Sequence, residues 1–107
     1  MDPRSYEIID GVKVYKLFID GEWIASSRNA LADSINPATG KVFARTHQAG
    51  AEEVVRAIDA AEAANATWGN STASEREKAL LRACDVVTAR TAEIRDMLID
   101  ECGSVFN

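Results

Sequence analysis

Residues 35–64 read INPATGKVFARTHQAGAEEVVRAIDAAEAA, and this stretch passes from a turn through a strand into a helix. Pro37 fixes its own φ angle and pushes Asn36 toward an extended conformation. Gly40 suits a backbone position of positive φ, which other residues rarely adopt. The run from Asn36 to Gly40 therefore predicts a defined turn, and the residues from Val42 to Thr46 predict a strand after it.

A first helix is predicted to follow this strand. Glu52 and Glu53 favour a helix N-terminus, because acidic side chains interact well with the positive end of the helix dipole. Residues of one helix face then recur at helical spacing, at Val54, Ile58, Ala61 and Asn65, with Ala57, Ala60 and Ala64 beside them. The spacing predicts an amphipathic helix that ends near residues 68–70.

Two further helices are predicted downstream. Residues 72–75 (TASE) and 74–77 (SERE) are overlapping capping boxes, in which a hydroxyl and a carboxylate satisfy the first amides of a helix. The apolar stripe of this second helix comprises Leu80, Leu81, Cys84 and Val87. The stripe restarts after Arg90, which predicts a break with Thr91 as a third N-cap. Gly103 is expected to end the third helix.

The N-terminal third of the chain predicts strands. Asp10-Gly11 and Asp20-Gly21 each stand between apolar residues, and Asp-Gly tolerates the two positive φ angles of a type I′ hairpin turn. Two such turns predict a three-stranded meander, which needs a helix or a second sheet against its apolar face. Its strands are expected near residues 6–9, 12–19 and 22–25. Residues 26–33 are predicted to form a polar loop.

The composition bounds the kind of protein. A chain of 107 residues allows one domain at most, and a hydrophobic share of 47% excludes a disordered tail. The net charge of −5 and the pI of about 4.8 disfavour a nucleic-acid or anionic-membrane surface. No apolar run reaches the roughly 18 residues of a membrane span, and no signal-peptide core opens the sequence. We expect a cytoplasmic protein with reduced cysteines.

Few side chains are candidates for chemistry. A reactive thiolate needs a nearby cation, a metal or a helix N-terminus, whereas Cys102 stands beside Glu101 at a predicted helix C-terminus. Cys84 falls on an apolar stripe and is expected to be a small core residue. His47 has no partner at ligand spacing, which disfavours a metal site around it. The six glycines are spread singly, so no glycine-rich phosphate loop is present. These patterns alone predict a small α+β region without a catalytic set.

Four stretches resemble the N-terminal part of the aldehyde dehydrogenase superfamily. They are LFIDGEWIAS (residues 17–26), the run quoted above (35–64), TASEREKALLRACDVV after Trp68 (72–87), and LIDECG (98–103). The resemblance covers residues 16–104. It implies an α/β fold, with N-terminal β-hairpins and three helices of the NAD(P)-binding domain, or α+β as an isolated fragment. Residues 1–15 would be an N-terminal extension with the first hairpin, and residues 16–107 the first, truncated part of that domain.

The resemblance also implies an activity for a longer parent protein. Members of this family oxidise an aldehyde to a carboxylic acid with NAD or NADP. A cysteine thiolate attacks the aldehyde, hydride passes to the cofactor, and a glutamate-activated water releases the acid. In the family pattern all these residues, and those that hold the cofactor, lie beyond Asn107. We expect no catalytic and no cofactor-binding residue here, and an inactive, structural chain. Its expected partner is the rest of a homodimeric or homotetrameric parent.

Two finer expectations rest on the same resemblance. Some members bind a structural monovalent cation between the turn and the end of the third helix. The matching groups are the backbone carbonyls of Ser34 or Ile35 and the side chain of Glu101, and oxygen ligands suit a hard cation. The alternative is a helix-end acid that only contacts the turn. Ser104 replaces a common lysine and resembles members that act on aromatic aldehydes such as benzaldehyde, vanillin or salicylaldehyde.

A hypothesis from another class stays open at this point. The chain is then a free-standing small helical interaction module, or a decayed gene product without catalysis. Its apolar helix faces would need a partner or self-association to be covered.

Overall fold

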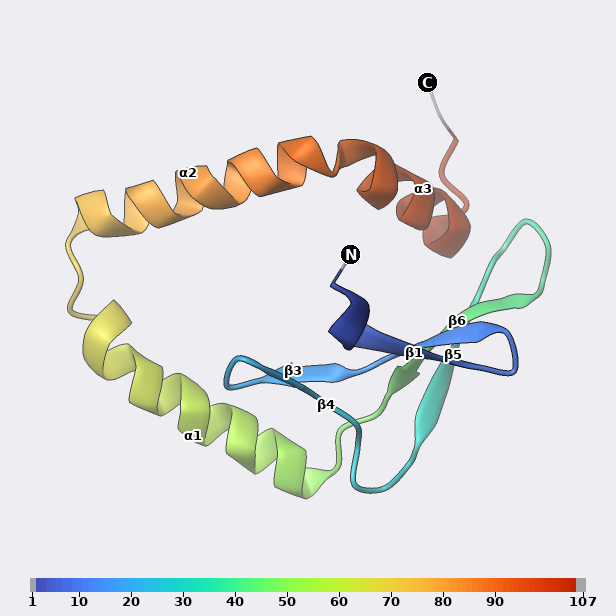
Figure 1. Ribbon diagram of the computed structural model, residues 1–107, viewed down its shortest axis with the longest axis horizontal. Coiled ribbons are helices and arrows are strands. Elements are labelled where there is room, and N and C mark those ends of the chain that lie inside the picture. The colour runs from blue at the N-terminus through green and yellow to red at the C-terminus, as the bar shows by residue number, and fades with distance from the viewer. Residues whose placement is uncertain (1, 106–107) are drawn as a thin grey trace.

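Strands and helices follow one another in the computed structural model, which describes residues 2–105 (Figure 1). A 3-10 turn at Pro3–Ser5 precedes six strands: β1 (Tyr6–Ile9), β2 (Val12–Tyr15), β3 (Leu17–Ile19), β4 (Glu22–Ile24), β5 (Leu31–Ile35) and β6 (Val42–His47). The helices are α1 (Ala51–Trp68), α2 (Ala73–Ala89) and α3 (Thr91–Cys102). The α/β fold class is therefore confirmed.

Both Asp-Gly turns have the predicted backbone. The φ angles are 51° and 77° at Asp10 and Gly11, and 53° and 78° at Asp20 and Gly21, as a type I′ turn requires. The three-stranded meander is nevertheless wrong. Its expected middle strand divides at Lys16 into β2 and β3, and these two strands belong to different sheets.

The strand divides because each half has a different partner. In the four-stranded sheet the order is β1-β2-β6-β5, and β2 runs parallel to β6. Val14 of β2 is 0% exposed and Ala44 of β6 is buried, so the core lies at this junction. The β3–β4 hairpin is a separate sheet that lies against α1, where Ile19 is buried.

Strand β5 occupies a region that the sequence predicts as mostly loop. It pairs antiparallel with β6, and Asp33 lies opposite Arg45 with 2.7 Å between the carboxylate and the guanidinium. Leu31 and Ile35 are exposed, while the small residues Ala32 and Ser34 between them are half-buried. The large apolar side chains thus face outward, and the usual alternation signal of a half-buried strand is inverted.

The helix boundaries follow the predicted signals with one exception. Thr72 caps α2, because its Oγ1 accepts from the N–H of Glu75 and its own N–H donates to Glu75 Oε2 at 2.7 Å. The break before α3 is confirmed, but Thr91 is not its N-cap. Thr91 is the first residue of α3, and its hydroxyl donates to the carbonyl of Thr88 at 2.8 Å. Arg90 takes the cap position.

Together the helices and the strands form an open arch (Figure 1). The radius of gyration is 16.8 Å, against roughly 13 Å for a compact domain of this length. The predicted helix stripes have the right spacing, but large apolar residues on them are exposed: Val54, Ile58, Leu80, Leu81 and Val87. Cys84 is exposed as well, so its expected place in a core is wrong, because no element within residues 2–105 covers that side of α2. None of the helices in the described chain has the length and apolar character of a membrane span.

Candidate functional site

The predicted turn after β5 is organised by Asn36. Its side-chain Oδ1 accepts hydrogen bonds from the N–H groups of Ala38 (2.9 Å) and Thr39 (3.1 Å). Its carbonyl accepts from the N–H of Gly40 at 2.8 Å, and its own N–H donates to the carbonyl of Lys41 at 2.9 Å. Gly40 has a φ of 67°, as predicted. The asparagine therefore closes the turn with its backbone and its side chain together.

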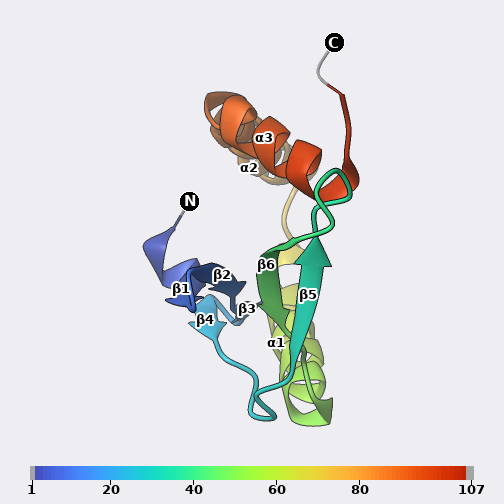
Figure 2. The ribbon, with the colours of Figure 1, turned by 90° about the vertical axis from the view of Figure 1, so that its right-hand side faces the viewer.

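The C-terminal end of α3 lies against this turn (Figure 2). Asn36 Nδ2 donates to Asp100 Oδ1 at 3.0 Å. Gly103 ends the helix in the left-handed conformation, with a φ of 66°, and its N–H donates to the carbonyl of Ile99. A Cβ added to Gly103 would lie 2.9 Å from Pro37 Cγ. We call the contact of Asn36 and Pro37 with Asp100 and Gly103 the turn–helix junction.

The residues predicted to hold a cation lie on the two sides of this junction. Ser34 and Ile35 are the last residues of β5, where a bulge interrupts the pairing with β6. Glu101 is exposed near the end of α3, directly after Asp100. Within residues 2–105 no three His, Cys, Asp or Glu side chains group as metal ligands. Asn36 and Asp100, the sequence neighbours of Ile35 and Glu101, are in contact at this junction, and the cation site stays a prediction.

A cleft of about 470 Å³ lies between the sheet and α3. Lys13, Tyr15 and Phe43 line it from the strands, and Asp96, Met97 and Asp100 are among the residues that line it from α3. Its lining contains no cysteine, serine or histidine.

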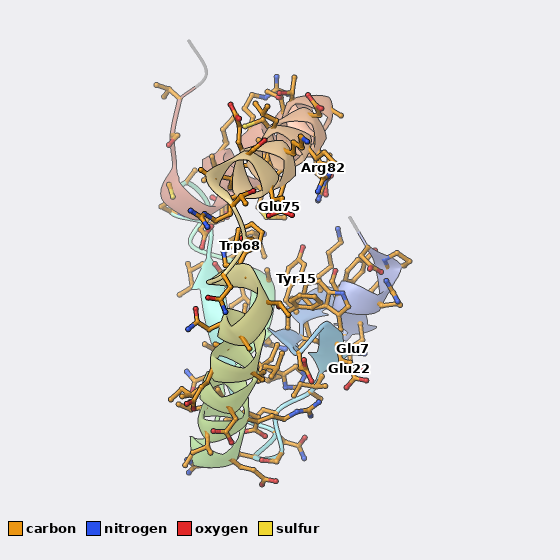
Figure 3. The ribbon with its side chains drawn as sticks, turned by 90° about the vertical axis from the view of Figure 1, so that its left-hand side faces the viewer. Glu7, Tyr15, Glu22, Trp68, Glu75 and Arg82 are labelled. Atoms are coloured by element: carbon orange, nitrogen blue, oxygen red, sulfur yellow. The ribbon has the colours of Figure 1, made fainter. Side chains whose placement is uncertain are left out.

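The two cysteines do not lie at positions that favour a reactive thiolate. Cys102 is the last residue of α3, as predicted, and both Cys84 and Cys102 are free and exposed. Neither stands at a helix N-terminus, where a helix dipole would favour a thiolate. The two tryptophans differ in exposure, because Trp23 is half-buried and Trp68 is exposed. Trp23 packs on Phe18 with 4.7 Å between ring centroids, and Trp68 ends α1 (Figure 3).

The sequence patterns did not predict a buried polar cluster that lies at the start of α1. Ser26, His47 and Glu53 are all buried. The N–H of Ser26 donates to His47 Nδ1 at 3.3 Å, and the two oxygens of Glu53 accept from the N–H groups of Ser27 and Gly50, each at 2.7 Å. Hydrogen bonds from Ser27, and then from the Gly50 amide, lower the pKa of Glu53 to about 2 against the opposing effect of burial. The cluster fixes the loop before β5 to the helix.

The strands and helices form a mixed α/β arrangement, and the chain belongs to the aldehyde dehydrogenase family. The model of the aldehyde dehydrogenase family matches residues 23–107. This match includes the turn–helix junction and all three helices.

Individual relatives agree with this assignment. D-glyceraldehyde dehydrogenase (NADP(+)) of Thermoplasma acidophilum is 39% identical over 88 residues, which are 82% of this chain and 18% of that protein. 2-Hydroxymuconic semialdehyde dehydrogenase of Pseudomonas putida is 43% identical over 83 residues, 77% of this chain and 17% of the relative.

A solved structure shares the fold as well. The crystal structure of succinate-semialdehyde dehydrogenase from Burkholderia pseudomallei superposes with a TM-score of 0.76 at 34% identity. It covers 92% of this chain and 19% of the other. The chain thus spans less than a fifth of the length of the proteins that it matches.

Proposed function

We propose that this chain is the N-terminal part of an NAD(P)-dependent aldehyde dehydrogenase that oxidises an aldehyde to a carboxylic acid. The observation that carries the proposal is the agreement in fold and sequence over 92% of the chain with a dehydrogenase of known structure. In such a parent the strands and helices described here shape the outer part of the cofactor domain. The chain alone is structural and inactive in this proposal, which is supported by the position of both cysteines away from the helix N-termini that favour a thiolate.

The finer features of the parent belong to the same proposal. Ser104, just after the end of α3, supports an aromatic aldehyde substrate, although the relatives named above carry the names of other aldehydes. One of these relatives uses NADP+ by its name, so we propose NAD or NADP as the cofactor. We further propose a homodimeric or homotetrameric parent. No residue of this chain is assigned to the hydride transfer.

A structural monovalent cation is part of this proposal. A carbonyl of Ser34 or Ile35 and the carboxylate of Glu101 would hold it beside the turn–helix junction, as oxygen ligands hold hard cations. The test compares the melting temperature of the parent in potassium, sodium and choline chloride at equal ionic strength. We expect one alkali cation to raise the melting temperature of the parent, and we expect Glu101→Gln to abolish this increase. Equal melting temperatures in all three salts would refute the proposed cation site.

Activity is tested on two proteins side by side. The parent protein that contains this segment and the pure 107-residue chain are each incubated with NAD+ or NADP+ and benzaldehyde, vanillin or succinate semialdehyde. We expect the absorbance of reduced cofactor to rise with the parent only. Turnover by the isolated chain would overturn its structural role. A folded parent that reduces neither cofactor with any aldehyde would overturn the dehydrogenase proposal.

A further inference from the structure

The side chain of Asn36 has two hydrogen-bonding groups, and each serves a different part of the fold. Its Oδ1 accepts from the amides of Ala38 and Thr39 inside the turn. Its Nδ2 donates to Asp100 on α3, which is 64 residues away in the sequence. The orientation of the amide is fixed from both sides, because two N–H groups require an acceptor and a carboxylate requires a donor.

The Asp100 contact lies at the free end of a long arm. Helices α2 and α3 form one side of the arch, and the chain enters that side through the connection after Trp68 (Figure 1). The junction with Asn36 and Pro37 lies at the opposite end, where α3 finishes. Asp100 also lines the cleft between α3 and the sheet.

We propose that Asn36 is a latch that couples the turn to the position of the α2–α3 arm. When the turn is formed, its oxygen is engaged and its nitrogen is presented to Asp100, which holds the arm over the sheet. When Asp100 is released, the turn persists but the arm opens. The coupling belongs to this chain itself and does not depend on the activity of a parent protein.

The polarity of the hydrogen bond gives a sharp test. Asn36→Asp keeps an oxygen for the turn amides, and aspartate forms such turns well, but it places a second carboxylate against Asp100. Asp100→Ala removes the acceptor and leaves the turn untouched. Asp100→Asn retains an amide oxygen as acceptor. The double variant Asn36→Asp/Asp100→Asn restores the bond with donor and acceptor exchanged. Asp96→Ala, one turn earlier on α3, is the matched control for the loss of a carboxylate.

The arm position is measured on the 107-residue chain as the distance between two spin labels. One label sits on the exposed Cys84 of α2 and the other on Ile8→Cys in β1, in a Cys102→Ser background. The amide resonances of Ala38 and Thr39 report separately whether the turn remains formed. Circular dichroism confirms that each variant keeps its helices.

We expect one narrow distance for the background, Asp96→Ala and Asp100→Asn. For Asn36→Asp and Asp100→Ala the ratio of open to closed arm rises roughly two- to tenfold, the effect of one net hydrogen bond. The exchanged pair should return to the narrow distance. Unchanged distances in both Asn36→Asp and Asp100→Ala would overturn the latch. So would an exchanged pair that stays open while its turn resonances are native. If Asn36→Asp loses the turn, the label distance in Asp100→Ala alone tests the latch: an unchanged distance then overturns it.

Discussion

Replacing Gly103 by alanine would test how tightly the end of α3 is held against the turn. Gly103 has a φ of 66°, and a left-handed conformation costs an L-residue roughly 1–2 kcal/mol. The new Cβ would also lie 2.9 Å from Pro37 Cγ, and overpacking of this kind costs roughly 1–3 kcal/mol. We therefore expect Gly103→Ala to lower the free energy of unfolding by about 2–5 kcal/mol.

A matched control separates the two contributions. Gly11 has a φ of 77° and open space around a new Cβ, so Gly11→Ala should carry the conformational cost alone. Pro37→Ala removes the Cγ atom and leaves the Cβ, which would lie 3.7 Å from the new alanine Cβ and so in ordinary contact with it. In the Pro37→Ala background the cost of Gly103→Ala should fall to that of Gly11→Ala.

The assay is urea unfolding of the 107-residue chain, followed by the far-ultraviolet circular dichroism of its helices. The coupling between Pro37→Ala and Gly103→Ala is read from a double-mutant cycle, which cancels the effect of proline on the unfolded chain. The reasoning is refuted if Gly103→Ala costs no more than Gly11→Ala. It is also refuted if the two substitutions at the junction are additive.

Three further outcomes are expected. Thr72→Ala should lower the free energy of unfolding by about 1 kcal/mol and raise amide exchange in the first turn of α2, because the cap to Glu75 is lost; unchanged exchange there would contradict this. Val14→Ala should cost roughly 2–3 kcal/mol in urea unfolding, because the side chain is 0% exposed between β1 and β6; a cost below that of an exposed valine such as Val55 would count against it. The pKa of Glu53 falls from 4.5 to about 2 on folding, so its carboxylate stabilises the fold above pH 4.5 and this stability is lost as the pH falls through 2. Melting temperatures should therefore fall less steeply over that range in Glu53→Gln, and parallel curves would argue against the cluster.

Local signals in the sequence predicted the local parts of this fold. The two Asp-Gly turns, the Pro37 and Gly40 turn, the Thr72 cap and the Gly103 stop were all confirmed. Each of these features depends on the conformational preference of a few adjacent residues, so a short window contains the whole cause.

Pairing between distant strands was not predictable in the same way. The parallel pairing of β2 with β6 joins Val14 to Arg45 across more than thirty residues, and no local preference specifies it. Strand β5 was hidden because it turns Ala32 and Ser34 toward the half-buried side. The exposure of Cys84 could not be predicted from the helical periodicity either, because periodicity identifies an apolar face but not what covers it.

The candidate site likewise combines local features that were predictable with long-range contacts that were not. The turn was predicted from its own residues, whereas its contact with Asp100 depends on how the whole arch closes. The cluster around Glu53 had one local signal, because Gly50 and Glu53 have the spacing of half a capping box. Its bond to Ser27 spans 26 residues and could be found only in the structure.

The bare apolar faces of the helices have a consequence during synthesis. If this segment opens a longer chain, its strands and helices leave the ribosome first. At roughly 5–20 residues per second, several hundred further residues take on the order of tens of seconds to follow. During that interval Leu80 and Leu81, 62% and 58% exposed, remain uncovered on α2. The nascent chain then presents exposed apolar side chains, a surface that chaperones protect, until the later parts of the polypeptide cover it.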